Sequence, residues 1–475
     1  MTRGLRRLVT AARERWARVP RERRVPVGLV VVAGALVVPL LPYGAWLAGG
    51  GLLAAVVVLG VRDGGRAEAE RAAAGARLTL IYEALVPYFG TAPDPSGPGL
   101  YAPGGSWRGC FLASGFGADG RLEMLRLAYP AFFPDGDHAA RERVEGVLVG
   151  KAGRDREYHF RWDEERNELE VVALPPLPAG IGAQRFVVGA GETVLGFTDE
   201  AVVDRRVPVR GGAEYAELVA APPVVWRTGP RAGEPHLLVA GAPGSGVTSL
   251  LRSVVLQALE RDEVLLVDGG GEAQFGCFAG RVGVAGVESG PGGGGDALRW
   301  VARETERRLS AAGRGRSAAV GGALWVVVDR PALLGHLARL AGGPDPSALL
   351  EVPLRYGRAV GVTVVLGEQL EGLGALGGAV FACTRARVVL GAVAAVQAAA
   401  VLGAPPCGSP VGWVPPGRGF ARLGAGPVVR LQVPVTPDPY DLAADEPWRR
   451  AVSALLPPMR VGGGGGREVG AGREA

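Results

Sequence analysis

The residues with the clearest chemical potential form a short glycine-rich loop, GAPGSGVTS, at Gly241–Ser249. The phosphate-binding pattern G-x-x-x-x-G-K-[ST] is matched at Gly241, Gly246 and Thr248. Glycines let backbone N–H groups close around phosphate, and the start of a following helix adds a positive dipole. A threonine hydroxyl at this place can ligate Mg²⁺, so the loop predicts a site for ATP and Mg²⁺. The candidate cofactor-binding residues are Gly241, Ala242, Pro243, Gly244, Ser245, Gly246, Val247, Thr248 and Ser249.

Val247 occupies the place where this pattern has lysine, the residue that reaches the β- and γ-phosphates. A hydrogen bond to a charged group is worth about 1.5–3 kcal/mol, so its loss could weaken nucleotide binding about tenfold or more. Lys151 is the only lysine in the chain, so no other lysine can replace it. Arg252, further along the predicted helix, is one candidate substitute. The alternative is a structural glycine-rich turn that binds no nucleotide.

A second candidate group follows the apolar segment Leu324–Val328, which predicts a buried strand. Asp329 follows at the end of this strand. In phosphoryl-transfer sites, the aspartate that holds Mg²⁺ also lies at the end of an apolar strand. The next position usually carries a glutamate that activates water, but here it is Arg330. The loop and this strand each lack one catalytic group, so the sequence predicts that hydrolysis is absent or very slow. The candidate metal ligands are Thr248 and Asp329.

These groups require a framework that brings them together. Short apolar segments that alternate with helical segments predict an α/β fold with a doubly wound parallel sheet. The loop opens one predicted helix, which continues through Glu260, and Asp296–Leu309 is a second, amphipathic one. The predicted strands are Leu237–Ala240, Glu263–Val267, Ala323–Val328, Val360–Leu366 and Ala386–Leu390.

The region before this sheet predicts a small α+β domain and a β-rich connector at residues 106–225. Its predicted elements are a strand at Arg121–Tyr129, a helix at Asp137–Val149 and a hairpin at Glu157–Leu174. Residues 62–105 predict a helix and a Pro/Gly-rich linker. The main domain is expected at residues 226–445, and residues 446–475 predict a disordered tail.

The N-terminal region predicts a membrane anchor. Val25–Val61 is an uncharged stretch of 37 residues, too long for one span and suited to two short ones with a turn near Leu41–Gly44. The preceding arginines predict that the N-terminal tail lies in the cytoplasm. The hairpin then returns the large C-terminal region to the same side of a cell membrane as a multi-pass protein. A cleaved signal peptide is the competing interpretation.

The charge distribution argues against a broad nucleic-acid surface on the C-terminal region. The first 24 residues hold nine arginines and two glutamates, a net charge of +7, which leaves −2 for the remaining chain. The basic tail is a candidate partner for anionic membrane lipid. Four cysteines without a CxxC pair, and scattered histidines, fit neither a zinc site nor a disulfide framework.

Several segments, in the same order, resemble the motor domain of the FtsK/SpoIIIE family of DNA translocases. The resemblance implies a RecA-like P-loop NTPase fold and an ATP-driven hexameric ring that moves double-stranded DNA. It also implies that Gln369 lies where the family senses γ-phosphate, so Asp329 and Gln369 are the candidate catalytic residues. The segments are Pro235–Thr248, Val267–Glu272, Leu298–Leu309, Leu354–Gln369 and Thr436–Asp441.

Three functions remain open at this point. One is a degenerate translocase subunit that binds ATP weakly and acts in DNA transfer or as an adaptor in a homo- or hetero-oligomeric ring. Another is a slow but active ATP-driven DNA motor. A third is a membrane-tethered pseudo-ATPase scaffold for secretion or the cell envelope, without DNA. Arg314–Ser317 is a candidate basic pore loop. The resemblance also implies a winged-helix module that reads DNA orientation, which we do not expect in the short segment after Asp441.

Overall fold

The computed structural model describes residues 68–90, 99–117, 119–152, 156–211, 217–314, 321–406 and 414–460. The predicted hairpin Val25–Val61 and the tail beyond residue 460 lie outside these ranges, as does most of Arg314–Ser317. Within the ranges, no helix is both long and apolar enough to cross a bilayer. The chain divides into two compact units. Of the described residues, one unit contains 68–83 and 116–121 apart from 118, and the other contains the remainder.

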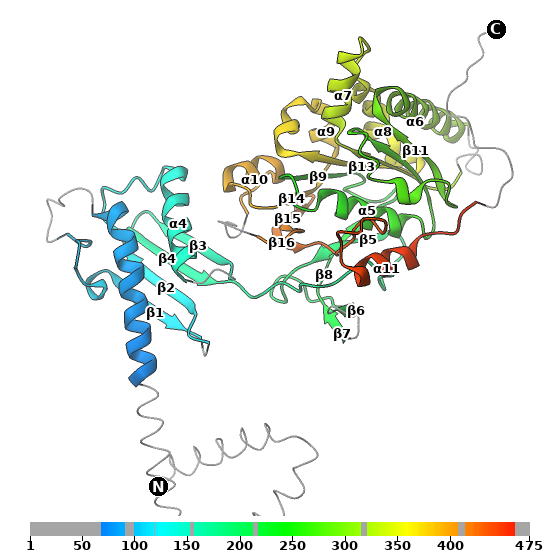
Figure 1. Cartoon of the computed structure of the whole chain (residues 1–475). Coiled ribbons are helices and arrows are strands. Elements are labelled where there is room, and N and C mark those ends of the chain that lie inside the picture. Colours follow the sequence, from blue (N-terminus) through cyan, green and yellow to red (C-terminus); the bar gives the residue numbers. More distant parts are fainter. Residues whose placement is uncertain are drawn as a thin grey trace, which may run out of the picture. The chain divides into compact units, whose positions relative to one another are not determined.

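A helix spans residues 68–89, where the alanine-rich sequence predicts one. After it comes a four-stranded antiparallel sheet of order β1-β2-β4-β3 with one helix, α4 (Figure 1). Asn167 turns the chain between β3 and β4 with a positive φ of 52°. The predicted strand, helix and hairpin of this region are confirmed. The elements are β1 (Phe111–Phe116), β2 (Leu122–Ala128), α4 (His138–Ala152), β3 (Tyr158–Asp163) and β4 (Glu168–Ala173).

The main feature is a ten-stranded sheet of order β11-β10-β12-β13-β9-β14-β15-β16-β5-β8. The strands from β11 to β14 run parallel, and the remainder are antiparallel. All five predicted strands are confirmed. The parallel strands are β9 (Leu237–Gly241), β10 (Glu263–Asp268), β11 (Val284–Ser289), β12 (Leu324–Asp329), β13 (Val362–Gln369) and β14 (Ala386–Leu390). The others are β15 (Arg418–Leu423), β16 (Val428–Gln432), β5 (Glu192–Phe197) and β8 (Pro223–Arg227), with β6 (Val207–Gly211) and β7 (Glu217–Ala221) as a separate ribbon.

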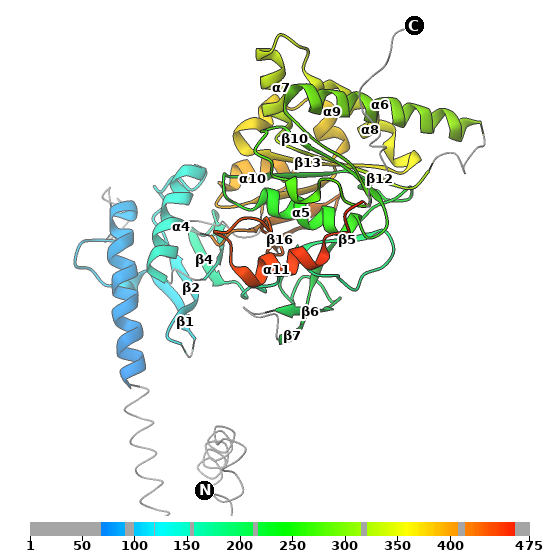
Figure 2. The same cartoon turned by 45° about the vertical axis from the view of Figure 1, so that its right-hand side comes forward.

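Helices cover both faces of the parallel strands (Figure 2). One face carries α5 (Val247–Ala258) and α11 (Glu446–Leu455). The opposite face carries α6 (Gly290–Gly313), α7 (Pro331–Leu340), α8 (Glu351–Tyr356), α9 (Gly378–Cys383) and α10 (Ala395–Leu402). This confirms the predicted α/β sheet with two covered faces. Short 3₁₀ turns complete the layers at Gly276–Phe278, Pro346–Leu350, Gly357–Val360 and Leu370–Ala375.

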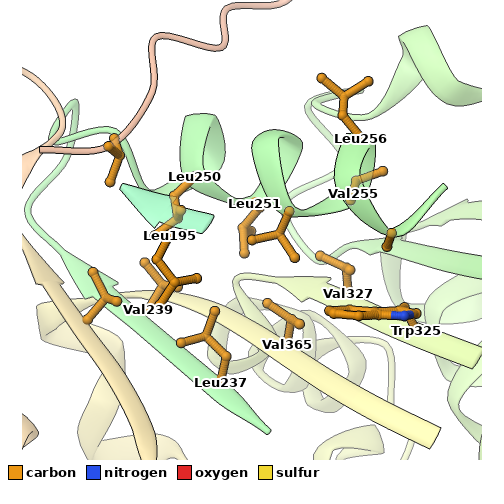
Figure 3. Close-up of a cluster of buried hydrophobic side chains, with 14 of the residues drawn as sticks. Leu195, Leu237, Val239, Leu250, Leu251, Val255, Leu256, Trp325, Val327 and Val365 are labelled. Carbon is orange, nitrogen blue, oxygen red and sulfur yellow. The ribbon is translucent and has the colours of Figure 1, made fainter. Parts of the chain in front are cut away.

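Each face has its own apolar core because successive strand residues point to opposite sides of a sheet. On β13, Val365 joins the cluster under α5, whereas Leu366 joins the cluster under α6 and α7. Figure 3 shows the α5 side, where Leu250 and Leu251 pack over strand residues that include Val327. Burying each such side chain contributes about 1.5–3 kcal/mol. The core therefore fixes the strand ends that carry the candidate site.

Two expectations were wrong. Helix α6 begins at Gly290, not near Asp296, because its glycine-rich first turns lie tightly against the sheet. A Cβ added at Gly294 would lie 3.0 Å from a Leu334 carbon and 3.1 Å from a Val267 carbon. The tail predicted from residue 446 contains α11, whose Val452 is buried in the α5-side core.

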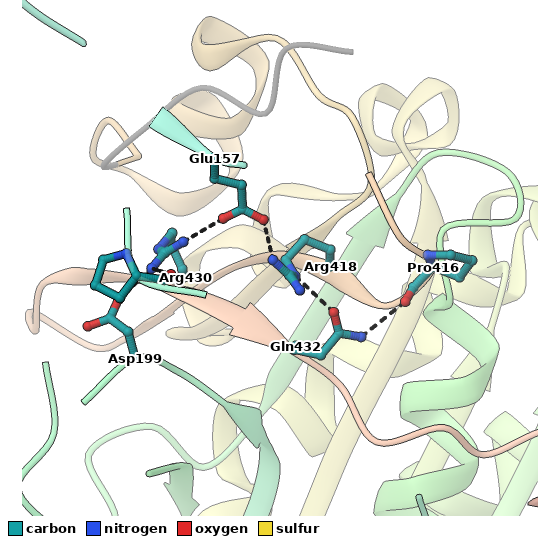
Figure 4. Close-up of polar contacts among 7 residues, drawn as sticks. Glu157, Asp199, Pro416, Arg418, Arg430 and Gln432 are labelled. Carbon is teal, nitrogen blue, oxygen red and sulfur yellow. Dashed lines mark hydrogen bonds and ion pairs between the residues drawn. The ribbon is translucent and has the colours of Figure 1, made fainter. Parts of the chain in front are cut away.

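A buried ion network joins β15 and β16 to segments earlier in the chain (Figure 4). Arg430 donates to Asp199 at 2.9 Å, to Glu157 at 2.6 Å and to the Pro175 carbonyl at 2.7 Å. Arg418 pairs with the other oxygen of Glu157. Arg430 is only 4% exposed, so its charge is stabilised by these carboxylates and not by water.

Candidate nucleotide-binding site

The predicted phosphate loop connects β9 to α5, the context in which such a motif binds phosphate. The Ser245 carbonyl accepts from the Gly417 N–H at 2.7 Å, which holds the loop against the segment before β15. Gly246 precedes α5 with φ 103°, and a Cβ there would lie 3.0 Å from the Gly417 nitrogen. The left-handed backbone and the close approach both require glycine at this position.

The first turn of α5 presents free backbone donors. The helix begins at Val247. At its start, the Leu250 N–H donates to the Gly246 carbonyl at 3.0 Å. The N–H groups of Gly246–Ser249 therefore have no acceptor in a preceding turn. Such backbone donors and the helix dipole favour an anion at this place even without a lysine.

Val247 contributes no side-chain donor to this site. Its side chain packs against the apolar cluster under α5. If Gly241 had a Cβ, that atom would lie 2.8 Å from one Val247 methyl carbon. A Cβ on Gly367 would lie 3.0 Å from the other methyl carbon. The valine therefore fills the space between the ends of β9 and β13.

Thr248 and Asp329 meet as the sequence predicts. The Thr248 hydroxyl donates to an Asp329 carboxylate oxygen at 3.1 Å. Asp329 is 2% exposed, and burial raises the pKa of its carboxyl to about 6. The Thr248 bond and Arg330 oppose this rise in pKa, whereas Asp268 and Glu368 add to it. A cation at this carboxylate would favour its charged form.

These two oxygens suit Mg²⁺, which usually takes one or two protein ligands and completes its shell with water and phosphate. Among the described residues, no group of three or more histidine, cysteine, aspartate or glutamate side chains could hold a metal by itself.

Two further carboxylates flank Asp329, and sequence analysis missed the role of both. Asp268 lies opposite Asp329 in the β10–β12 register and accepts from the N–H groups of Gly270, Gly271 and Gln274. Glu368 accepts from Ala332 N–H at 2.7 Å and from Gln369 N–H at 2.9 Å. Burial raises the pKa of Glu368. Both carboxylates are occupied in ordering the turns around the site.

Arg330 has an unusual backbone. Its φ and ψ are 55° and 54°, a left-handed conformation that costs a non-glycine residue about 1–2 kcal/mol. Its N–H donates to the Gly367 carbonyl at 2.7 Å, and Pro331 begins α7 directly after it. Its guanidinium pairs with Glu272 at 2.7 Å. The turn between β12 and α7 is thus fixed from several directions.

A cavity of about 230 Å³ lies over the loop and the ends of β12 and β13. It brings the loop together with Asp329 and Gln369, as predicted, and adds Arg330 and Glu368. Its lining residues are Ala242, Pro243, Gly244, Gly246, Val247, Thr248, Ser249, Asp329, Arg330, Glu368 and Gln369. Gly241 and Ser245, also predicted for the site, are buried and are not among these lining residues.

Arg252 is not the substitute for the missing lysine. It is a buried residue of α5, and its guanidinium donates to the Gln274 carbonyl at 2.9 and 3.0 Å and lies 3.6 Å from Asp438. Its charge is directed at these oxygens, and it does not line the cavity. Arg308 belongs to Leu298–Leu309, the α6 segment that resembles the FtsK/SpoIIIE family. It also has a structural role, because it is buried and donates to the Gly322 and Val360 carbonyls.

The fold and the loop define a class. In the order β14-β9-β13-β12-β10, β13 separates the loop strand from the strand that ends in Asp329. This is the arrangement of a RecA-like P-loop ATPase domain, so the predicted fold of the main domain is confirmed.

No protein-family model matches the chain, and no curated protein matches its sequence. Solved structures do match. The cytoplasmic domain of the type VII secretion ATPase EccC of Thermomonospora curvata is 21% identical, with a TM-score of 0.42, over 59% of this chain and 33% of that one. ATPases 2 and 3 of EssC from Geobacillus thermodenitrificans are 15% identical, with a TM-score of 0.44. That match covers 59% of this chain and 52% of the EssC chain.

The conjugation coupling protein TcpA of pCW3, in a structure with ATPγS, is 15% identical, with a TM-score of 0.45. That match covers 76% of this chain and 96% of TcpA. In contrast, the chain spans only a third of the EccC chain and about half of the EssC chain. EccC is a type VII secretion ATPase, the EssC structure contains its ATPases 2 and 3, and TcpA is a conjugation coupling protein.

Proposed function

We propose that the chain is a membrane-anchored, FtsK/SpoIIIE-like subunit that binds ATP with Mg²⁺ weakly and hydrolyses it very slowly or not at all. The observation that carries the proposal is the contact between Thr248 and Asp329 beside a loop in which Val247 replaces lysine. The metal-binding half of the site is retained, while the charged group on the loop is absent.

Weak binding follows from the donors that remain. Backbone N–H groups of Gly246–Ser249 and the α5 dipole hold the phosphates. Thr248 and Asp329 hold Mg²⁺, and Gln369 at the end of β13 lies where it can contact the terminal phosphate. Without the lysine, the affinity is lower by about tenfold or more.

Slow hydrolysis follows from the state of the carboxylates. A water-activating base needs a free carboxylate oxygen near the terminal phosphate. Asp329 serves the metal, and the oxygens of Glu368 and Asp268 accept backbone N–H groups. The glutamate position after the β12 strand is Arg330, which cannot accept a proton. Among the described residues that line the cavity, Asp329 and Glu368 are the carboxylates, and both already accept hydrogen bonds that fix their orientation.

The biological setting of this proposal is DNA transfer, or an adaptor in a homo- or hetero-oligomeric ring at the cell membrane. The basic N-terminal tail, suited to anionic lipid, and the uncharged stretch Val25–Val61 support the location. A secretion or envelope scaffold that binds no DNA is favoured by one observation, the net charge of −2 after the first 24 residues.

The test is calorimetric titration of ATP·Mg²⁺ into the detergent-solubilised full chain, with Val247→Lys alongside. We expect the wild-type chain to bind ATP measurably. We expect Val247→Lys to bind it more tightly, by about tenfold or more. Absence of binding by both proteins would mean that the loop is a structural turn. Turnover comparable to an active ATPase, lost in Asp329→Ala, would refute slow hydrolysis. A gel shift with double-stranded DNA at stated salt then separates the transfer role from the scaffold.

A further inference from the structure

Arg330 is the one cation among the described residues that line the cavity. It follows Asp329 directly, so its backbone is fixed next to the carboxylate assigned to Mg²⁺. Burial raises the pKa values of Asp329 and Glu368, and the charge of Arg330 opposes this rise. Arg330 therefore brings a positive charge to the same cavity that the phosphate loop lines.

The conformation of Arg330 is imposed by its surroundings. The bond from its N–H to Gly367 and the capture of Ala332 N–H by Glu368 hold the strand end and the start of α7 on either side of it. A left-handed arginine persists only where neighbouring contacts over-determine it, and such residues concentrate at functional sites. Ala273, next to the ion-pair partner Glu272, is left-handed as well, with φ 58°. Strained backbone thus flanks both ends of one ion pair.

That ion pair is a weak restraint. Glu272 has a side chain that is 54% exposed, so water screens its attraction to the 26%-exposed Arg330. Only one guanidinium nitrogen, Nη1, makes this contact. Gln274 donates to the other Glu272 oxygen at 3.1 Å. A phosphate offers more charge and a geometry that matches the arginine fork, so it can displace the carboxylate.

We propose that Arg330 is the phosphate-binding cation of this site and replaces, from the end of β12, the lysine that Val247 displaces from the loop. The ligand class is a nucleoside triphosphate, whose β- and γ-phosphates carry the charge that Arg330 neutralises. Glu272 holds the guanidinium before nucleotide arrives and competes with phosphate for it. The inference rests on the proposed function, since it requires that the cavity binds nucleotide.

This relocation has a chemical consequence. The position that gains the cation is the one where an active site of this kind has its base. One residue therefore strengthens phosphate binding and removes proton abstraction at the same time. Such a site can respond to nucleotide occupancy without consuming the nucleotide.

The test uses the full chain in detergent and compares ATP·Mg²⁺ affinities by calorimetry. Arg330→Gln is expected to weaken ATP binding about ten- to hundredfold, with little effect on AMP, which lacks the terminal phosphates. Glu272→Gln, which removes the competitor, is expected to tighten ATP binding several-fold. Val247→Lys in the Arg330→Gln background is expected to restore affinity. Arg355→Gln breaks a similar 2.8 Å ion pair with Glu351 outside the cavity and is the matched control.

The outcomes separate the two proposals. If the wild-type chain binds ATP and Arg330→Gln binds it equally well, the role of Arg330 is overturned and the proposed function stands. If the wild-type chain and Val247→Lys both fail to bind, the proposed function fails and this inference with it. If Arg330→Gln does not fold, Glu272→Gln decides, because unchanged or weaker ATP binding in that variant contradicts the competition on which the inference depends.

Discussion

His236 makes the stability of the main domain depend on pH in a way that one substitution can isolate. It is fully buried before β9, and its Nδ1 accepts from the Val364 N–H at 3.0 Å. Burial lowers the pKa of His236 to about 4 from 6.5, with a smaller contribution from Arg358 and an opposing one from the Leu354 backbone. The folded state therefore favours the neutral form of the His236 ring.

The sign follows from proton binding in the two states. The folded-state pKa is depressed, so between about pH 6.5 and pH 4 the unfolded chain binds a proton at His236 that the folded chain does not. Stability is therefore lost as pH falls through this window. A tenfold difference in proton affinity between the two states is worth about 1.4 kcal/mol, so the full effect is about 3 kcal/mol, of which about 2 kcal/mol is lost between pH 7 and pH 5.

The assay is denaturant unfolding of wild type and His236→Asn at pH 7 and pH 5. Asparagine keeps an oxygen that can accept from the Val364 N–H but does not titrate, so the variant loses this part of the pH dependence. Other ionisable groups affect both proteins and cancel in the difference between them. We expect the wild type to lose about 2 kcal/mol more than the variant over this range. Equal losses in the two proteins would refute the assignment to His236.

Three other substitutions test the site and its support. Asp329→Asn should remove the Mg²⁺ dependence of ATP binding, measured as equal affinity with and without chelator, and a retained Mg²⁺ effect would contradict the metal role. Arg430→Met should destabilise the fold by about 3–5 kcal/mol in urea unfolding, because Asp199 remains buried without its cation, whereas a loss below about 1 kcal/mol would mean that water replaces it. Gly294→Val should cost about 1–3 kcal/mol in the same assay through contact with Leu334 and Val267, and an unchanged midpoint would show that α6 can move away.

The strands and the loop could be predicted because their signals are local. Each of the five predicted strands is a short apolar run, and Gly246 and Thr248 lie at the spacing a phosphate loop demands. Parallel strands then bring Asp329 to the loop without further information, because the carboxyl ends of such strands meet at one edge of the sheet.

What could not be predicted depends on contacts between distant residues. Strand β11 has only a mixed sequence, VAGVES, and is recognisable only by its pairing with β10. Glu368 gives no sequence signal because its partner is the backbone N–H of Ala332, 36 positions earlier in the chain. That interaction becomes visible only once α7 is placed against β13. From the sequence, Arg330 indicated only that the usual glutamate is replaced. The cavity shows that the arginine also brings a positive charge to the site.

The solitary lysine of the chain has a practical consequence for testing whether the chain forms an oligomer. Lys151 lies exposed in the last turn of α4, outside the cavity-lining residues. Amine-reactive cross-linkers can therefore join only Lys151 and the chain's N-terminal amine, so a cross-linked product between two copies maps to very few sites. The same chemistry places a fluorophore or surface tether on α4, with the N-terminal amine as the other reactive group, and leaves the loop residues unmodified. An almost complete replacement of lysine by arginine thus leaves one lysine side chain as an attachment point for testing assembly.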